Sequence, residues 1–194
     1  MSPTPSELKT QLRIGLRAEA RRFSSAQRAE ASAQICERLR EQEVWSSAQS
    51  ILFYAPMPEE PDLHPLLAHA LAEEKAVILP RYSSRDGVYV ACLVRDLEKQ
   101  LQPGTFGIRE PAIECPIFDL KKLDLILVPG VGFALTGFRL GRGKGYYDRL
   151  LAQVSGFKCG IAFDWQVAVE VPAESHDIRL DCILTPTRWH EVPR

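Results

Sequence analysis

Apolar residues recur at the spacing of an α-helix through the first part of the chain. The pattern predicts one helix over residues 7–23, capped by Ser6, and a second helix that is capped by Ser24 or Ser25 and ends near Glu41. Both helices are amphipathic, so each needs another apolar layer to cover one side. The buried positions are expected at Leu8, Leu12, Leu16 and Ala20 in the first helix, and at Ala29, Ala33 and residues 36–39 in the second.

Beyond these helices, short apolar runs alternate with further helical patterns. Two more helices are expected, at residues 63–74 and about 146–154, and Arg85-Asp86-Gly87 has the residue types of a hairpin turn. Residues 101–116 are rich in proline and glycine and are expected to form a loop. The expected strands are residues 50–55, 76–80, 87–94, 123–128, 157–163 and 181–184. This alternation predicts an α/β fold, a single three-layer α/β/α domain over residues 1–194 with a mixed, mostly parallel central sheet.

A glycine-rich, basic segment joins the predicted strand at 123–128 to the predicted helix that begins near residue 146. Arg139, Arg142 and Lys144 lie within it, and Asp148 follows one turn into the helix. Glycine lets the backbone approach an anion with its N–H groups free, Arg and Lys neutralise phosphate oxygens, and a carboxylate recruits Mg²⁺. The glycines are Gly137, Gly141, Gly143 and Gly145. The segment therefore predicts a site for ATP or another polyphosphate with Mg²⁺.

The plainer interpretation of this segment is that its glycines end the strand and its cations lie on a solvated loop. It also departs from the standard nucleotide motifs. Phe138 replaces the first glycine of the P-loop, Gly145 replaces its Ser or Thr, and Tyr146 replaces the third glycine of the dinucleotide fingerprint. The residues by themselves leave both interpretations open.

Two further groups of charged residues are candidates for ligand contacts. Lys9, Arg13, Arg17 and Arg21 repeat every fourth residue along the first predicted helix, where like charges repel one another and favour an anionic partner. An acidic loop, MPEEPD at residues 57–62, follows the first predicted strand, at the end where open α/β sheets bind ligands. The plainer alternatives are a solvated helix face and a solvated acidic turn.

Composition narrows the class of protein. A chain of 194 residues with a net charge of -1 has no global basic field that would attract nucleic acid or an anionic membrane. The five cysteines are far apart and never form C-x-x-C, which indicates reduced thiols, and no apolar stretch has the length of a leader or a membrane span. We therefore expect a cytoplasmic protein.

The segment TGFRLGRGKGYYDR, together with the preceding PGVGF, closely resembles the signature of the 5-formyltetrahydrofolate cyclo-ligase family, also called methenyltetrahydrofolate synthetase. Four further matches follow the family's order: K-x-x-x-R at Lys9 and Arg13, E-x-D at residues 60–62, FGIREP at residues 106–111 and HDIRLD at residues 176–181. Two positions depart from the pattern. Ala134 stands where the family usually has Asp, which weakens the expectation of a metal, and Pro186 stands where an acidic residue is common.

The resemblance implies an ATP- and Mg²⁺-dependent enzyme that converts 5-formyltetrahydrofolate to 5,10-methenyltetrahydrofolate, releasing ADP and phosphate. It implies catalytic roles for Lys144, Arg142 and Tyr146, and Mg²⁺ ligands at Asp148 and Asp177; His176 is expected to be a hydrogen-bonding loop residue. The implied ATP contacts are Lys9, Arg13, Arg139, Leu140, Gly141, Arg142, Gly143, Lys144, Gly145, Tyr146 and Tyr147. The implied folate contacts are Ala55, Glu60, Arg142, Gly143, Lys144, Gly145 and Tyr146.

Two other functions share the same cations. One is a kinase or ligase that uses ATP on another substrate, and the other is a non-catalytic nucleotide- or folate-binding protein. The expected partner is a small folate, with no nucleic acid and no membrane, and the expected oligomeric state is a monomer.

Overall fold

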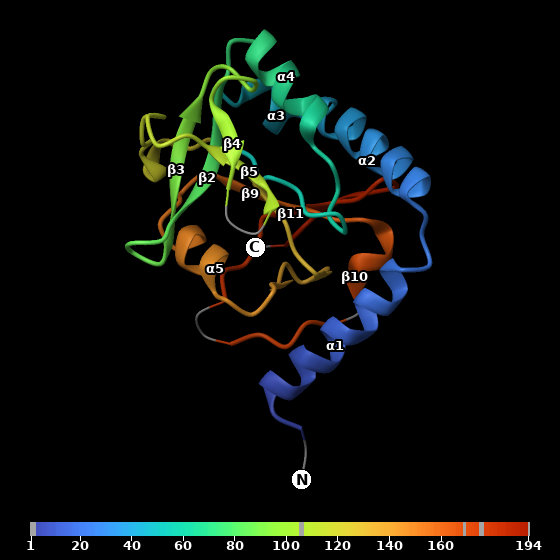
Figure 1. Ribbon diagram of the computed structural model, residues 1–194. Coiled ribbons are helices and arrows are strands. Elements are labelled where there is room, and N and C mark those ends of the chain that lie inside the picture. Colours follow the sequence, from blue (N-terminus) through green and yellow to red (C-terminus); the bar gives the residue numbers. More distant parts are fainter. Residues whose placement is uncertain (1–2, 105–106, 169, 175–176, 194) are drawn as a thin grey trace.

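Seven strands drawn from residues 50 to 191 form one main sheet in this computed structural model (Figure 1). The structure describes residues 3–104, 107–168, 170–174 and 177–193. Phe106 and His176, the first residues of two of the motif matches, lie outside the described residues. The strands are β1 (Ser50–Leu52), β2 (Ala76–Ser83), β3 (Val88–Val94), β6 (Leu125–Val128), β9 (Phe157–Ile161), β11 (Cys182–Leu184) and β12 (Trp189–Glu191).

The sheet has the order β12-β11-β9-β6-β1-β2-β3, with β6 at its centre. All neighbouring strands from β11 to β2 run parallel, whereas β3 and β12 pair antiparallel at the two edges. This confirms the mixed, mostly parallel sheet and the hairpin between β2 and β3. Because β1 and β6 are parallel neighbours, the loops that follow them lie side by side at the carboxyl ends of the strands, where ligands of open α/β sheets bind.

Helices cover both faces of the sheet. One face packs against α2 (Ser25–Arg40), α3 (Glu43–Ser47) and α4 (His64–Ala72), which lie toward the top of Figure 1. The other face packs against α5 (Tyr146–Leu151) and a small three-stranded sheet. That small sheet consists of β7 (Gly132–Ala134), β8 (Arg139–Leu140) and β10 (Val167–Ala168), joined to the core by the buried ring of Phe133. The three layers match the predicted architecture.

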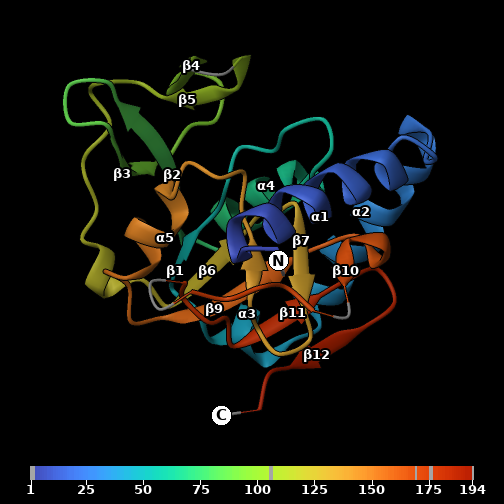
Figure 2. The ribbon, with the colours of Figure 1, turned by 90° about the horizontal axis from the view of Figure 1, so that it is seen from below.

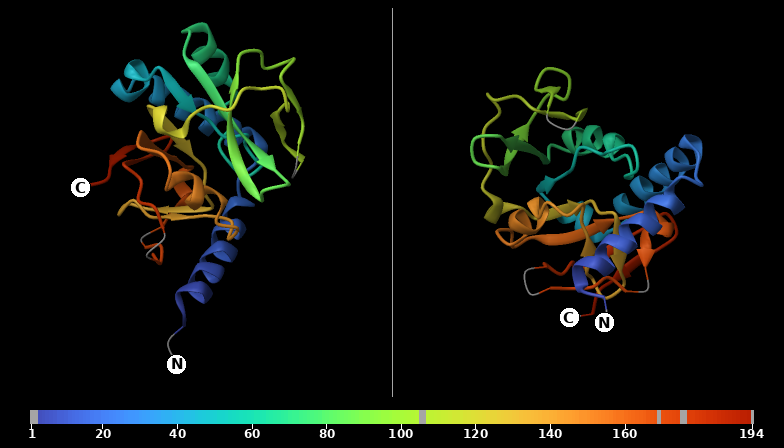
Figure 3. Two further views of the ribbon diagram at one scale, coloured as in Figure 1. Left: turned by 90° about the vertical axis from the view of Figure 1, so that its left-hand side faces the viewer. Right: turned by 60° about the horizontal axis from the view of Figure 1, so that its bottom comes forward.

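The first helix, α1 (Pro5–Ala20), stands apart from these layers. Thr4 caps it, exchanging hydrogen bonds with Glu7, so the prediction of Ser6 as the cap is wrong. Its partly buried Leu12 and Leu16 pack on an apolar cluster of the small sheet, and Figure 2 shows α1 beside β7 and β10. Figure 3 shows its N-terminal end pointing away from the rest of the molecule. Leu8 at that end is therefore exposed rather than buried.

Several other expectations change in detail. Ser24 caps α2 as predicted, but Ala29 and Ala33 are exposed because the helix presents Ser32, Ile35, Cys36 and Leu39 to the core. Residues 101–116 contain a short antiparallel pair, β4 (Leu101–Pro103) and β5 (Arg109–Pro111), where only a loop was expected. The edge strand β12 was not predicted, and two short turns of 3-10 helix, η2 (Leu120–Lys122) and η3 (Asp164–Gln166), complete the described elements.

Gly156, just before β9, occupies a position that has no room for a side chain. A Cβ atom there would overlap the carbonyl oxygen of Leu123, which belongs to rigid backbone. We therefore expect Gly156→Ala to lower the free energy of unfolding by about 1–3 kcal/mol, as overpacked positions do. Gly15, in the interior of α1, is the matched control because a Cβ atom there meets no atom within 4 Å. Gly15→Ala should raise the free energy of unfolding by about 0.5–1 kcal/mol, and urea unfolding of both variants checks the opposite signs.

Candidate active site

A cavity of about 260 Å³ opens at the carboxyl ends of the parallel strands, between the loops that follow β1 and β6. The loop after β1 contributes Ala55 and Glu60, and the glycine-rich segment contributes most of the remaining wall. Tyr89 of β3 completes an aromatic side. The predicted site residues that line the cavity are Ala55, Glu60, Arg139, Gly141, Arg142, Lys144, Gly145, Tyr146, Tyr147 and Asp148.

Arg139, on β8, is the most deeply buried cation of the cavity. Its Nη2 donates to Asp148 Oδ1 at 2.6 Å, its Nη1 donates to the carbonyl oxygen of Pro129, and its guanidinium lies over the ring of Tyr147. The side chain is only 5% exposed, and its Nε has no hydrogen-bond partner among the described residues. The solvated-loop interpretation is therefore wrong for Arg139. Arg139 thus places a buried positive charge in the wall of the cavity, beside Asp148.

Arg142 and Lys144, on the loop between β8 and α5, have different surroundings. Arg142 donates to Glu60 from Nη2 at 3.1 Å and from Nε at 3.3 Å, and its Nη2 lies 3.5 Å from Glu59 Oε2. Glu60 also accepts a hydrogen bond from the backbone N–H of Met57. Lys144 is exposed and forms no ion pair with any described residue. Its ammonium therefore meets a ligand without first giving up a carboxylate.

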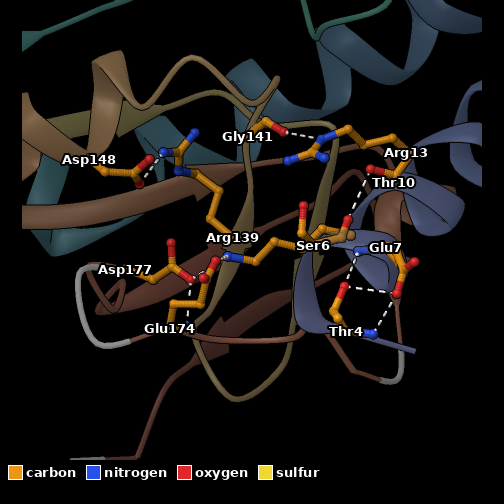
Figure 4. Close-up of polar contacts among 11 residues, drawn as sticks. Thr4, Ser6, Glu7, Thr10, Arg13, Arg139, Gly141, Asp148, Glu174 and Asp177 are labelled. Atoms are coloured by element: carbon orange, nitrogen blue, oxygen red, sulfur yellow. Dashed lines mark hydrogen bonds and ion pairs between the residues drawn. The ribbon is translucent and has the colours of Figure 1, made fainter. Parts of the chain in front are cut away.

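The two cations of α1 have different partners, and Arg13 is the one that contacts this segment (Figure 4). Arg13 Nε donates to the carbonyl oxygen of Gly141 at 2.9 Å, and its guanidinium packs on Gly143. Lys9 Nζ binds Glu174 at 2.7 Å and Asp177 at 2.8 Å. Burial by itself would lower the pKa of Lys9, but its hydrogen bonds to Asp177 and Glu174 outweigh this and raise the pKa. Lys9 is therefore charged at neutral pH.

The remaining predicted residues lie outside the lining of the 260 Å³ cavity. Leu140 is buried in the apolar cluster beneath α1, and Gly143 lies against Arg13. Asp177 belongs to the ion pair of Lys9, whereas Asp148 belongs to that of Arg139. The structure thus gives each of the two predicted metal ligands a different cation as its partner.

Tyrosine rings form the aromatic side of the cavity. The hydroxyl oxygens of Tyr82 and Tyr146 are 3.4 Å apart, and the ring of Tyr89 contacts both rings edge-on. Burial, with the charge of Glu110, raises the pKa of Tyr89 to about 12. Burial, with the charge of Glu60, also raises the pKa of Tyr147. At neutral pH the hydroxyls of Tyr89 and Tyr147 are therefore protonated, so they can donate hydrogen bonds and cannot act as bases.

Comparisons with known proteins identify the family of this chain. The sequence profile described as the 5-formyltetrahydrofolate cyclo-ligase family matches residues 5–186. The chain belongs to this family. It is therefore an enzyme of the ligase class, and the family connects it to folate metabolism.

Similar cyclo-ligases occur in distant organisms. The 5-formyltetrahydrofolate cyclo-ligase of Mus musculus is 27% identical over 93% of this chain and 95% of its own length. That of Mycolicibacterium smegmatis is 33% identical over 73% of this chain and 76% of its own length. The solved structure of 5,10-methenyltetrahydrofolate synthetase from Aquifex aeolicus superposes with a TM-score of 0.86 and 34% identity, covering 96% of this chain and 94% of that one.

The two departures from the cyclo-ligase signature have different surroundings. Ala134 is fully buried in the apolar cluster with Val131 and Leu140, where an unpaired carboxylate would be costly. The carbonyl oxygen of Pro186 accepts a hydrogen bond from Arg38 Nε, far along the chain from the glycine-rich segment. Neither departure removes a cation from the cavity of this cyclo-ligase.

The residues of this cyclo-ligase do not form a preassembled metal cage. Among the described residues, no group of three or more His, Cys, Asp or Glu side chains is placed to hold a metal ion. Mg²⁺ commonly binds through one or two carboxylates together with substrate phosphates. Asp148, which lines the cavity and has one carboxylate oxygen on Arg139, fits that second arrangement.

Sequence reasoning missed Tyr89 in the cavity of this cyclo-ligase, and Glu174, which binds Lys9 outside the lining of that cavity. Tyr89 pairs directly with Tyr82 across the hairpin, so two aromatic residues opposite each other were an available signal. Glu174 could not be identified from the sequence, because only the fold brings it to Lys9.

The five cysteines are buried and form no disulfide, as the composition predicted. Every described helix is too short or too polar to cross a membrane.

Proposed function

We propose that this chain, as one cyclo-ligase domain, uses ATP and Mg²⁺ to convert 5-formyltetrahydrofolate to 5,10-methenyltetrahydrofolate, with release of ADP and phosphate. One observation carries the proposal. A single cavity joins the cations Arg139, Arg142 and Lys144 to the carboxylate of Glu60, so a polyphosphate and a heterocycle rich in N–H donors can meet there.

The chemistry we propose has two steps. The formyl oxygen on N5 attacks the γ-phosphorus of ATP, and the bond from that phosphorus to the β,γ-bridging oxygen breaks to release ADP. N10 then attacks the formyl carbon and loses its proton, while the C–O bond breaks and phosphate departs with the electron pair. Phosphorylation thus turns a poor leaving oxygen into a good one, and the protein has to supply positioning and charge neutralisation.

We assign these tasks mainly to residues that line the cavity. Lys144 and Arg142 neutralise the transferred phosphoryl group, Arg139 adds positive charge from the wall of the cavity, and Glu60 accepts hydrogen bonds from the pterin. Tyr146 lines the cavity and donates a hydrogen bond from its hydroxyl to the substrate. We also assign phosphate contacts to Arg13, which binds the glycine-rich segment from α1, and to Lys9, four residues before it on the same helix.

Mg²⁺ bound to the triphosphate would neutralise the charge that develops on its oxygens. We propose Asp148 as the protein ligand, since it lines the cavity. Asp177 stays a prediction as a second ligand, because its carboxylate is engaged by Lys9. We further propose a monomeric, cytoplasmic enzyme without a nucleic-acid partner, which agrees with the buried thiols and the net charge of -1.

The test is to incubate the pure protein with ATP, Mg²⁺ and 5-formyltetrahydrofolate and to follow the near-ultraviolet absorbance of the methenyl product. We expect one ADP for each methenyl group formed, and no product when ATP or Mg²⁺ is left out. Tight binding of both ligands without product would contradict the proposal in favour of a binding protein. Release of ADP with another acceptor but no methenyl product would favour a different ATP-dependent enzyme.

A further inference from the structure

Arg142 and Glu60 form an ion pair between the two substrate regions of the cavity. Both residues line it, and they come from different loops, Arg142 from the segment after β8 and Glu60 from the loop after β1. Two hydrogen bonds, of 3.1 and 3.3 Å, join the guanidinium to one carboxylate oxygen of Glu60. In the ligand-free protein, Arg142, the proposed phosphate contact, is therefore paired with Glu60, the proposed pterin contact.

The two partners differ in how much they depend on this contact. The side chain of Glu60 is 8% exposed, and its hydrogen bonds among the described residues come from Arg142 and the backbone N–H of Met57. The side chain of Arg142 is 32% exposed and has a second acceptor in Glu59, which is 57% exposed. Because a buried charge that loses its partner is strongly destabilised, separation of this pair costs free energy mainly through Glu60.

We propose that ATP and the folate bind cooperatively because each of them must separate the Arg142–Glu60 pair. This rests on the proposed function of the cavity. A polyphosphate draws Arg142 away and leaves Glu60 ready for the N–H donors of the pterin. A pterin that occupies Glu60 leaves Arg142 with only the exposed and weaker partner Glu59, from which phosphate takes it readily. Whichever ligand binds first bears the cost of separation, so the second binds more tightly.

Coupling of this kind is reciprocal, so it can be measured from either side. Titration calorimetry of the full chain would give the dissociation constant of a non-hydrolysable ATP analogue with Mg²⁺, with and without saturating 5-formyltetrahydrofolate. We expect the folate to tighten binding of the analogue about 5-fold or more, and the analogue to tighten binding of the folate by the same factor.

Two variants separate this proposal from a merely structural role of the acidic loop. Glu60→Gln removes the buried partner of Arg142, so in the absence of folate it should bind the ATP analogue more tightly than the wild type. Glu59→Gln removes the same charge from the neighbouring position but keeps the buried pair, and should retain the coupling between the two ligands. A far-ultraviolet circular dichroism spectrum confirms that both variants are folded.

The outcomes are distinct. Both ligands binding with affinities that do not depend on each other would overturn the proposed coupling and leave the proposed function standing. So would Glu60→Gln protein that is folded but binds the ATP analogue no more tightly than the wild type. If neither ligand binds the wild-type protein, the proposed function itself fails, and the coupling with it.

Discussion

Replacing Lys144 with Met is expected to lower kcat/KM for formation of the methenyl product by about 100- to 1,000-fold, the usual cost of losing one preorganised group that stabilises transition-state charge. The free energy of unfolding should not change, because Lys144 is exposed and forms no ion pair with any described residue. The activity is measured from the near-ultraviolet absorbance of the product, and the stability from urea unfolding.

Lys121→Met is the matched control for this experiment. Lys121 is also an exposed lysine, but it lies on η2 and is not part of the cavity. Its replacement should leave both activity and stability close to the wild-type values. A Lys144→Met enzyme that turns over at a rate near the wild type would remove the role assigned to that ammonium.

Replacing Arg139 with Met should have the largest effect on stability, lowering the free energy of unfolding by about 3–5 kcal/mol, as expected when one partner of a buried ion pair is removed. The loss leaves Asp148, which is 21% exposed, without its cation, and removes the hydrogen bond to the carbonyl oxygen of Pro129. Urea unfolding of this variant and of the wild type gives the value.

Arg149→Met tests whether burial is the reason for that effect. Arg149 lies on the same helix as Asp148, and its guanidinium covers the ring of Tyr146, but the side chain is exposed. An exposed cation–π contact contributes about 0.5–1 kcal/mol, so this variant should lose no more than that. Equal losses in the two variants would show that the Arg139–Asp148 pair has no special weight in the fold.

The parallel part of the sheet could be predicted from the sequence because continuous apolar runs mark strands that are buried on both faces. The edge strand β12 could not, since Trp189, His190 and Glu191 are partly exposed and form no apolar run. The orientation of α2 was misjudged for a related reason. Its small alanines fit either side of a helix, and the larger Ile35 and Leu39 decide which side faces the core.

The site could be predicted to the level of its residue types but not of its pairs. The glycines and cations of residues 137–145 lie close together in the sequence and therefore in space. The loops that follow β1 and β6 lie beside each other because these two strands are parallel neighbours. The partner of each cation depends on the whole fold, as with Lys9 and Asp177, which are 168 positions apart. Asp148 and Asp177, the two expected metal ligands, therefore form ion pairs that the sequence did not predict, with Arg139 and Lys9 respectively.

Helix α1 packs on the small sheet through one side, with Leu12 and Leu16, and is not part of the main sheet. It nevertheless carries Lys9 and Arg13. Substitutions on its outer surface therefore have little effect on the packing of the core. The phosphate contacts proposed for Lys9 and Arg13 can therefore be strengthened or weakened by substitutions that leave the main sheet unchanged.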